Sequence, residues 1–210
     1  MEGMISLYYS FLMDYLPGQS KKIALLQLTG RIEDYLVKEF FWYAYKKSNF
    51  CFGNVDGKGQ QKVDICLLKQ SNDKPIIFSM IEVKYFRNIH RIWLETDATD
   101  EIMTSLSSLK RQLHICKHLE HGTMKVELRA KTKSIYGLVF GSFVSAKKND
   151  PDKQKFFSKI LNYAKKDFRY HDLPKPYFRP IFDDVKLKVF DETYCVTLKG
   201  GLWKRKGAII

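Results

Sequence analysis

Three ionisable residues interrupt two strongly apolar segments of the chain. Asp64 stands within the apolar run 63–68, and Glu82 and Lys84 end the longer run 76–84. An unpaired charge in a low-dielectric interior is costly, so such residues need a partner or a function. Residues two apart in a strand share one face, which places Glu82 and Lys84 together, and a hairpin brings Asp64 beside them. We therefore expect two carboxylates to converge next to one ammonium group.

This combination of side chains suits the hydrolysis of phosphodiesters. Mg²⁺ prefers oxygen ligands and keeps part of its water shell, so Asp64 and Glu82 could hold it, with the backbone carbonyl of Val83 as a further ligand. The ion would polarise a phosphoryl oxygen and lower the pKa of a bound water, which Lys84 would orient or deprotonate. Glu33, on the inward side of an expected helix, could hold metal-bound water. We expect Mn²⁺ to substitute for Mg²⁺.

The acid-x-Lys triplet has little weight by itself. The chain contains it at 56–58, 82–84 and 184–186, which is about the number expected by chance. The first lies in a Gly-rich turn, and the last lacks both a long apolar run before it and an Asp-bearing strand upstream. Only the triplet at 82–84 follows a long apolar run and has an Asp-bearing strand upstream.

The elements that must position these residues follow from hydrophobic spacing. Apolar residues at helical intervals from Leu25 to Phe40 predict one long helix over about 21–47. Two strands at 62–69 and 75–85, joined by a short turn, should form an antiparallel hairpin, and both are apolar on both faces and therefore central. The other expected elements are a first strand at 50–55, a helix at about 97–119, a buried strand at 134–144, a helix at 156–168 and a closing hairpin at 185–190 and 193–198.

The predicted fold class is therefore α/β, with a central mixed sheet flanked by helices in the order α-β-β-β-α-β and a C-terminal β-hairpin extension. We expect one domain over 1–210, with a core at about 20–145 and a basic elaboration at about 151–210.

A helix glutamate, an Asp in the second core strand and Glu-x-Lys ending the third are the pattern of the PD-(D/E)XK nuclease superfamily, which the chain resembles over roughly 20–145. Val63 departs from the pattern, which has proline before the Asp. The resemblance implies a restriction-endonuclease-like core and metal-dependent hydrolysis of DNA, less often of RNA. Because many members carry a glutamine on the following helix, it also makes Gln112 a candidate catalytic residue.

The charge balance points to a polyanionic partner. The chain has 36 Lys and Arg against 23 Asp and Glu, a net charge of +13, as expected of a protein that binds polyphosphates. Nucleic acid, with DNA favoured over RNA, is the expected partner. A protein that cuts both strands of a duplex with one site per chain would act as a homodimer, and a partner-protein complex is the alternative. The side chains that could contact phosphates beside the site are Arg87, Arg91, Lys110, Arg111 and Lys117.

Several function classes are not expected. No run approaches the ~18 apolar residues of a membrane span, and the apolar start at 5–16 has no basic leader, so we expect a cytoplasmic protein without a membrane partner. The four cysteines form no CxxC pair. His114 and His118 are four apart on the helix expected at 97–119, a spacing that can hold zinc, but no HExxH glutamate accompanies them.

Two alternatives to catalysis stay open. Each charge alone could be structural, with Asp64 at a sheet end, Glu82 and Lys84 as a surface pair, and Glu33 bridging to Arg31 or Lys38. The whole chain could also be a non-catalytic nucleic-acid-binding or assembly protein that retains a nuclease fold. The four residues together, in order and on the right elements, favour the nuclease.

Overall fold

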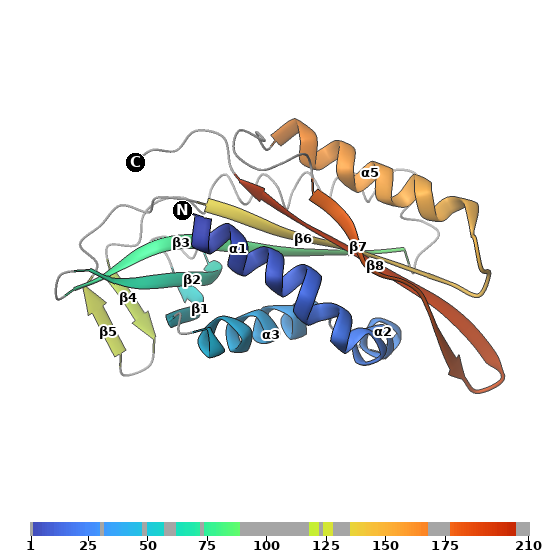
Figure 1. Ribbon diagram of the computed structural model, residues 1–210, viewed down its shortest axis with the longest axis horizontal. Coiled ribbons are helices and arrows are strands. Elements are labelled where there is room, and N and C mark those ends of the chain that lie inside the picture. Colours follow the sequence, from blue (N-terminus) through green and yellow to red (C-terminus); the bar gives the residue numbers. More distant parts are fainter. Residues whose placement is uncertain are drawn as a thin grey trace.

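The structure contains a six-stranded mixed sheet with helices on both faces, so the predicted α/β class is correct (Figure 1). The computed structural model describes residues 2–29, 32–47, 50–56, 62–71, 74–88, 118–121, 124–127, 135–167 and 177–204. The strands of the sheet lie in the order β1 (Phe50–Asp56), β2 (Lys62–Ser71), β3 (Lys74–Arg87), β6 (Ile135–Ser145), β8 (Glu192–Lys204) and β7 (Tyr177–Val189). A separate small hairpin joins β4 (His118–His121) to β5 (Met124–Glu127).

The expected hairpin at the heart of the sheet is confirmed. β2 and β3 pair antiparallel from Ser71 opposite Lys74 to Ile65 opposite Ile81. β3 then pairs parallel with β6, while the other neighbours in the sheet are antiparallel. β2 and β3 each have a strand on both sides, as predicted from the apolar residues on both faces of each strand.

The helical segment expected at 21–47 is two helices, so the prediction of one long helix was wrong. α2 spans Ser20–Thr29 and α3 spans Ile32–Lys46. Gly30 lies in the sequence between them, and glycine costs about 1 kcal/mol relative to alanine inside a helix. α3 nevertheless buries the predicted stripe of Ile32, Leu36 and Phe40.

The chain begins with a helical segment ahead of α2. α1 (Glu2–Ser10) continues as a π-helical turn, Phe11–Tyr15, and a 3₁₀ turn, Leu16–Gln19. Phe11, Leu12 and Leu16 are fully buried in the main core. This core therefore begins well before residue 20.

β6 shows which helices cover which face of the sheet. On one face, the Tyr136 ring packs against Tyr8 of α1, and the Ser142 hydroxyl donates a 2.6 Å hydrogen bond to Gln27 of α2. On the other face, the Phe143 ring contacts Phe156 of α5 (Pro151–Asp167). The alternation of side chains along a strand thus places α1, α2 and α3 on one face and α5 on the other (Figure 1).

α5 begins five residues earlier than the helix expected at 156–168, because the sequence carries an N-terminal cap. The Asp150 carboxylate accepts a 3.0 Å hydrogen bond from the backbone N–H of Asp152. Pro151 occupies the first helical position, where its missing N–H is of no consequence. The Asp-Pro pair therefore marks the start of α5.

The C-terminal hairpin is part of the main sheet, and only its tip extends beyond the pairing with β6 (Figure 1). β8 lies between β6 and β7, and both hairpin strands are longer than expected. Its Val196, Leu198 and Leu202 are fully buried in the same core as α1 and α3. The expected helix at 97–119 falls mostly outside the described residues, but it cannot reach Leu119, since His118 and Leu119 belong to β4.

Candidate functional site

Two carboxylates meet the backbone of β3 where its pairing with β2 ends. Beyond the pair of Ile65 and Ile81, the Asp64 side chain of β2 accepts a 2.8 Å hydrogen bond from the backbone N–H of Val83. The Glu33 side chain of α3 accepts a 3.2 Å hydrogen bond from the backbone N–H of Tyr85. The structure thus brings two of the four predicted site residues to one short stretch of β3.

The geometry of an extended strand explains this convergence. Residues two apart direct their N–H groups to the same edge, so Val83 and Tyr85 both face the side on which β2 lies. Side-chain carboxylates here take the place of the carbonyls that a continuing β2 would offer. Within one strand residue the C=O points to the same edge as the N–H, so the Val83 carbonyl, a predicted metal ligand, faces the edge at which Asp64 is bound.

The other predicted residues are only partly within the described part of the chain. Glu82 and Lys84 lie in β3 on either side of Val83, but their side chains are not among those described. Arg87 ends β3 and is exposed. Gln112, Arg91, Lys110, Arg111 and Lys117 lie outside the described residues.

The residues that flank the site on β3 are apolar and buried. Ile81 is fully buried and Val83 is nearly so. Burial also raises the pKa of the Tyr85 hydroxyl well above its ordinary value of 10.0. The Tyr85 side chain packs against the main core.

A polar contact between the N-terminal segment and α3 fixes the helix that carries Glu33. The Tyr15 hydroxyl donates a 2.5 Å hydrogen bond to Glu39, and the Lys22 ammonium lies 3.7 Å from the same carboxylate. Burial alone would raise the pKa of Glu39, but the hydrogen bond from Tyr15 and the charge of Lys22 lower it. Burial, followed by the Glu39 hydrogen bond, raises the pKa of Tyr15 to about 12. This contact ties α3 to the segment that precedes α2.

Asn88 fixes the far end of β3, a role that the sequence did not reveal. Its amide donates a 3.0 Å hydrogen bond to the carbonyl of Val144 and accepts a 2.7 Å hydrogen bond from the N–H of the same residue. Its own N–H donates to the Ser142 carbonyl at 3.3 Å. The side chain thereby extends the β3–β6 pairing past Arg87. In the sequence, this role is indicated only by the position of Asn88 directly after Arg87, the last residue of β3.

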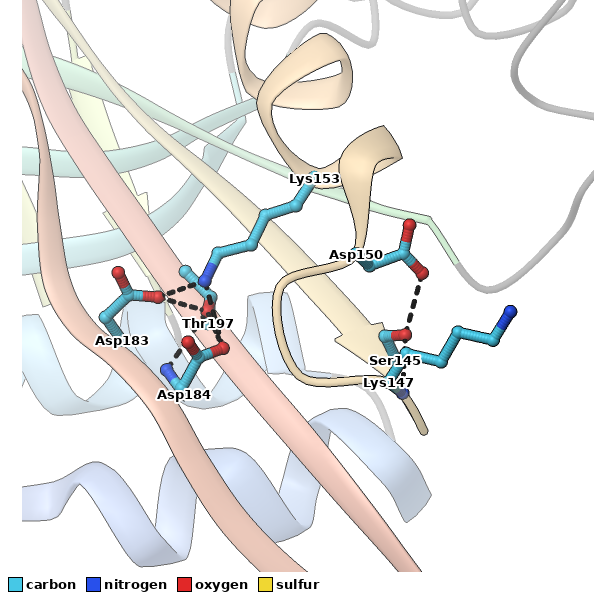
Figure 2. A network of polar contacts seen from close by, with 7 residues as sticks. All are labelled: Ser145, Lys147, Asp150, Lys153, Asp183, Asp184 and Thr197. Atoms are coloured by element: carbon cyan, nitrogen blue, oxygen red, sulfur yellow. Dashed lines mark hydrogen bonds and ion pairs between the residues drawn. The ribbon is translucent and has the colours of Figure 1, made fainter.

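The third acid-x-Lys triplet, at 184–186, takes part in a different network that joins α5 to β7 and β8 (Figure 2). The Lys153 ammonium of α5 donates hydrogen bonds to the carboxylates of Asp183 and Asp184, the second at 3.0 Å. The Thr197 hydroxyl also donates to Asp183, at 2.6 Å, and accepts from the Asp184 N–H. Asp184 has a positive φ of 49° where the β7–β8 register shifts. These contacts give the two aspartates a structural role.

The other residues of metal-binding type are dispersed or lie in different elements. No group of three or more His, Cys, Asp or Glu suited to a metal occurs among the described side chains, which do not include that of Glu82. His118 lies in β4 and not in a helix, and His114 lies outside the described residues. Cys195 is a buried free thiol.

Comparison with known proteins adds no assignment. Family models, curated proteins and solved structures all gave no match to the chain. Over the described residues, no helix has the length and apolar character needed to cross a membrane.

Proposed function

We propose that the protein is a metal-dependent nuclease with a restriction-endonuclease-like core, most concretely a DNA endonuclease. The observation that carries this proposal is the convergence of the Asp64 and Glu33 carboxylates on consecutive same-edge N–H groups of β3, at Val83 and Tyr85. These N–H groups alternate along the strand with the positions of Glu82 and Lys84. The side chains of Asp64 and Glu33 thus meet the part of β3 that carries Glu82 and Lys84, which supports a common site for the four residues.

The donor groups fit a hard divalent cation such as Mg²⁺ or Mn²⁺. A carboxylate has about four lone-pair directions, so Asp64 can accept the Val83 N–H and still coordinate an ion. Glu82 and the Val83 carbonyl would complete the protein ligands. When bound, the cation supplies polarisation of a phosphoryl oxygen and a lowered pKa for its water.

Each residue then has a distinct task in hydrolysis. Lys84 orients the attacking water and takes up its proton, and the ammonium so formed offsets the negative charge that grows on the phosphoryl oxygens. Glu33 holds that water from the α3 side. The Val83 N–H keeps the Asp64 carboxylate in one orientation, so that the oxygen donors are positioned before substrate arrives.

Charge supports nucleic acid as the substrate. The net charge of +13 favours association with a phosphate backbone. Exposed Arg87, three residues beyond Lys84 on β3, is a candidate phosphate contact. We propose DNA over RNA, and a homodimer if both strands of a duplex are cut.

A non-catalytic nucleic-acid-binding protein is the second candidate, and one observation favours it. Asp64 and Glu33 each already satisfy a backbone N–H, so both carboxylates have a structural reason to be present. The two candidates differ in whether a cation binds and in whether phosphodiesters break.

Cleavage assays with conservative variants test the proposal. Asp64→Asn keeps an acceptor for the Val83 N–H but removes the charge, and Lys84→Met removes the amine. Plasmid, linear, branched and single-stranded DNA, and RNA, are incubated with Mg²⁺, Mn²⁺ or EDTA. We expect metal-dependent cleavage by the wild type, a loss of about 100-fold or more in either variant, and no change in Asp34→Asn, an exposed carboxylate on α3.

Calorimetry with Mg²⁺ separates the two candidates. Binding heat that disappears in Asp64→Asn supports the nuclease. A wild type that binds nucleic acid, gives no Mg²⁺ heat and cleaves no substrate would establish the non-catalytic protein.

A further inference from the structure

The outer face of α3 carries an exposed aromatic patch. The buried stripe of this helix, including Leu36 and Phe40, packs on the sheet, and the opposite stripe faces solvent. On that outer stripe, Trp42 is 54% exposed and Tyr45 is 59% exposed. Large aromatic side chains left in water forgo the stabilisation that burial would give, so their exposure indicates a binding surface.

The two rings are already arranged as a stack. The Trp42 and Tyr45 centroids lie 5.6 Å apart with an interplanar angle of 18°. At this centroid separation the stacked rings overlap only in part, so 54% of Trp42 and 59% of Tyr45 stay exposed. A planar, aromatic group can extend such a stack without any rearrangement of the helix.

Positive charge surrounds the rings. The Lys46 ammonium lies 5.3 Å from the Trp42 ring centroid, and Lys38 is exposed one turn before Trp42. Lys47, directly after the helix, is exposed too. The exposed acidic residue of α3 is Asp34, so exposed positive charge exceeds exposed negative charge on this helix. The α3 aromatic patch (Lys38, Trp42, Tyr45 and Lys46) therefore combines flat apolar faces with cations.

We propose that the α3 aromatic patch binds single-stranded nucleic acid, with bases stacked on Trp42 and Tyr45 and phosphates contacted by Lys38 and Lys46. Unpaired bases offer a π-face to the rings, whereas in a duplex the faces are already covered by neighbouring bases. The lysines match the phosphate backbone. A second copy of this chain is a poor occupant, since a symmetric contact would bring the lysines of both copies together.

The patch is a binding site separate from the candidate active site. Glu33 and Trp42 are nine residues apart on one helix, which sets them about 14 Å apart along the axis and about 180° apart around it. The patch therefore faces away from the carboxylates that meet β3. The inference rests on the surface of α3 and does not depend on the proposed nuclease activity.

Binding measured without divalent metal tests this inference independently of cleavage. Fluorescence anisotropy in EDTA compares labelled oligothymidine, an RNA strand and a duplex on the wild type and on Trp42→Ala/Tyr45→Ala. We expect the double variant to lose about tenfold in affinity for the single strands and to keep its affinity for the duplex. Trp42→Phe, which keeps a ring, should retain most of the affinity.

Two controls test whether a loss of affinity comes from loss of any exposed ring or from unfolding. Phe190→Ala removes another exposed aromatic ring, at the β7–β8 turn, and should leave the affinity unchanged. Circular dichroism verifies folding, and Trp42→Gln takes the place of the double variant if that variant does not fold. Single-strand affinity unchanged by loss of the rings, an equal loss for the duplex, or a change in self-association alone would overturn the inference.

Discussion

The Glu33 carboxylate of α3 accepts a hydrogen bond from the backbone N–H of Tyr85, 52 residues along the chain. This contact joins the first layer of helices to the strand that carries Glu82 and Lys84. With the Asp64–Val83 bond, it replaces two links of the β2–β3 ladder by side chains. The same carboxylates thus shape the local backbone and form half of the proposed active site.

Two variants of Asp64 should differ in their effect on stability but not in their effect on cleavage. Asp64→Ala removes an acceptor of the partly buried Val83 N–H and should cost about 1–3 kcal/mol, whereas Asp64→Asn keeps an acceptor and should cost less. Both variants should lose cleavage. Urea denaturation measures the difference in stability, and equal stabilities would show that this hydrogen bond contributes nothing.

The network of Lys153, Asp183, Asp184 and Thr197 makes the free energy of unfolding depend on pH. Burial alone would raise the pKa of Asp183, but its hydrogen bonds with Lys153 and Thr197 outweigh this and lower the pKa below 3.8. A lowered folded-state pKa stabilises the protein above the unfolded value, and that stabilisation is lost as the pH falls through the folded value. The pKa of Lys153 is raised above 10.5, since the two carboxylates outweigh its desolvation, so its contribution is lost only in strong base.

Removal of the Asp183 carboxylate should therefore reduce the amount by which stability falls at acid pH. We expect the urea midpoint of Asp183→Asn to lie below that of the wild type at neutral pH, and the two midpoints to approach each other below about pH 4. The control is Asp191→Asn, an exposed carboxylate at the β7–β8 turn. A constant difference at all pH values would mean that ionisation of Asp183 does not matter.

Gly141 allows α5 to lie against β6. A Cβ at this position would lie 2.8 Å from Cδ1 of Ile160 and 3.0 Å from Cζ of Phe178. Gly141→Ala should therefore cost about 1–3 kcal/mol through overpacking. Ile160→Val removes the Cδ1 atom, so the double variant should recover part of this loss. Gly18→Ala, where no atom lies within 4 Å of an added Cβ, should not be destabilised, as thermal denaturation can verify.

Phe190 holds an unfavourable backbone conformation at the β7–β8 turn. Its φ is 55°, and its side chain is 92% exposed, so no packing offsets the strain. Phe190→Gly should raise stability by about 1 kcal/mol, while Phe190→Ala keeps the strain and should gain nothing comparable. Melting temperatures decide between them, and equal values for the two variants would argue against backbone strain.

The sequence predicted the elements whose signal is local. Apolar runs located β2, β3 and β6, and the short connection at 71–74 identified the antiparallel hairpin. The break between α2 and α3 was missed because the apolar spacing continues across Gly30. The predicted start of α5 was late because the apolar spacing begins only at Phe156, whereas the Asp150-Pro151 cap starts the helix before it.

Contacts between distant segments could not be predicted in the same way. Both strands of the closing hairpin have strand-like sequences, but nothing local indicates that β8 pairs with β6. The prediction that Asp64 belongs beside the Glu82-x-Lys84 segment gains support from its bond to Val83. That Glu33 reaches the backbone of β3 depends on the packing of α3, which no spacing rule specifies.

The position of β8 between β6 and β7 also affects folding during synthesis. While the ribosome is still translating the region before Glu192, β6 has no neighbour on one side and β7 has no partner in the sheet. The nascent chain must therefore carry an open, apolar strand edge until β8 emerges. We expect chaperones that shield such edges to matter for the yield of this protein, and chains released before β8 is made to aggregate.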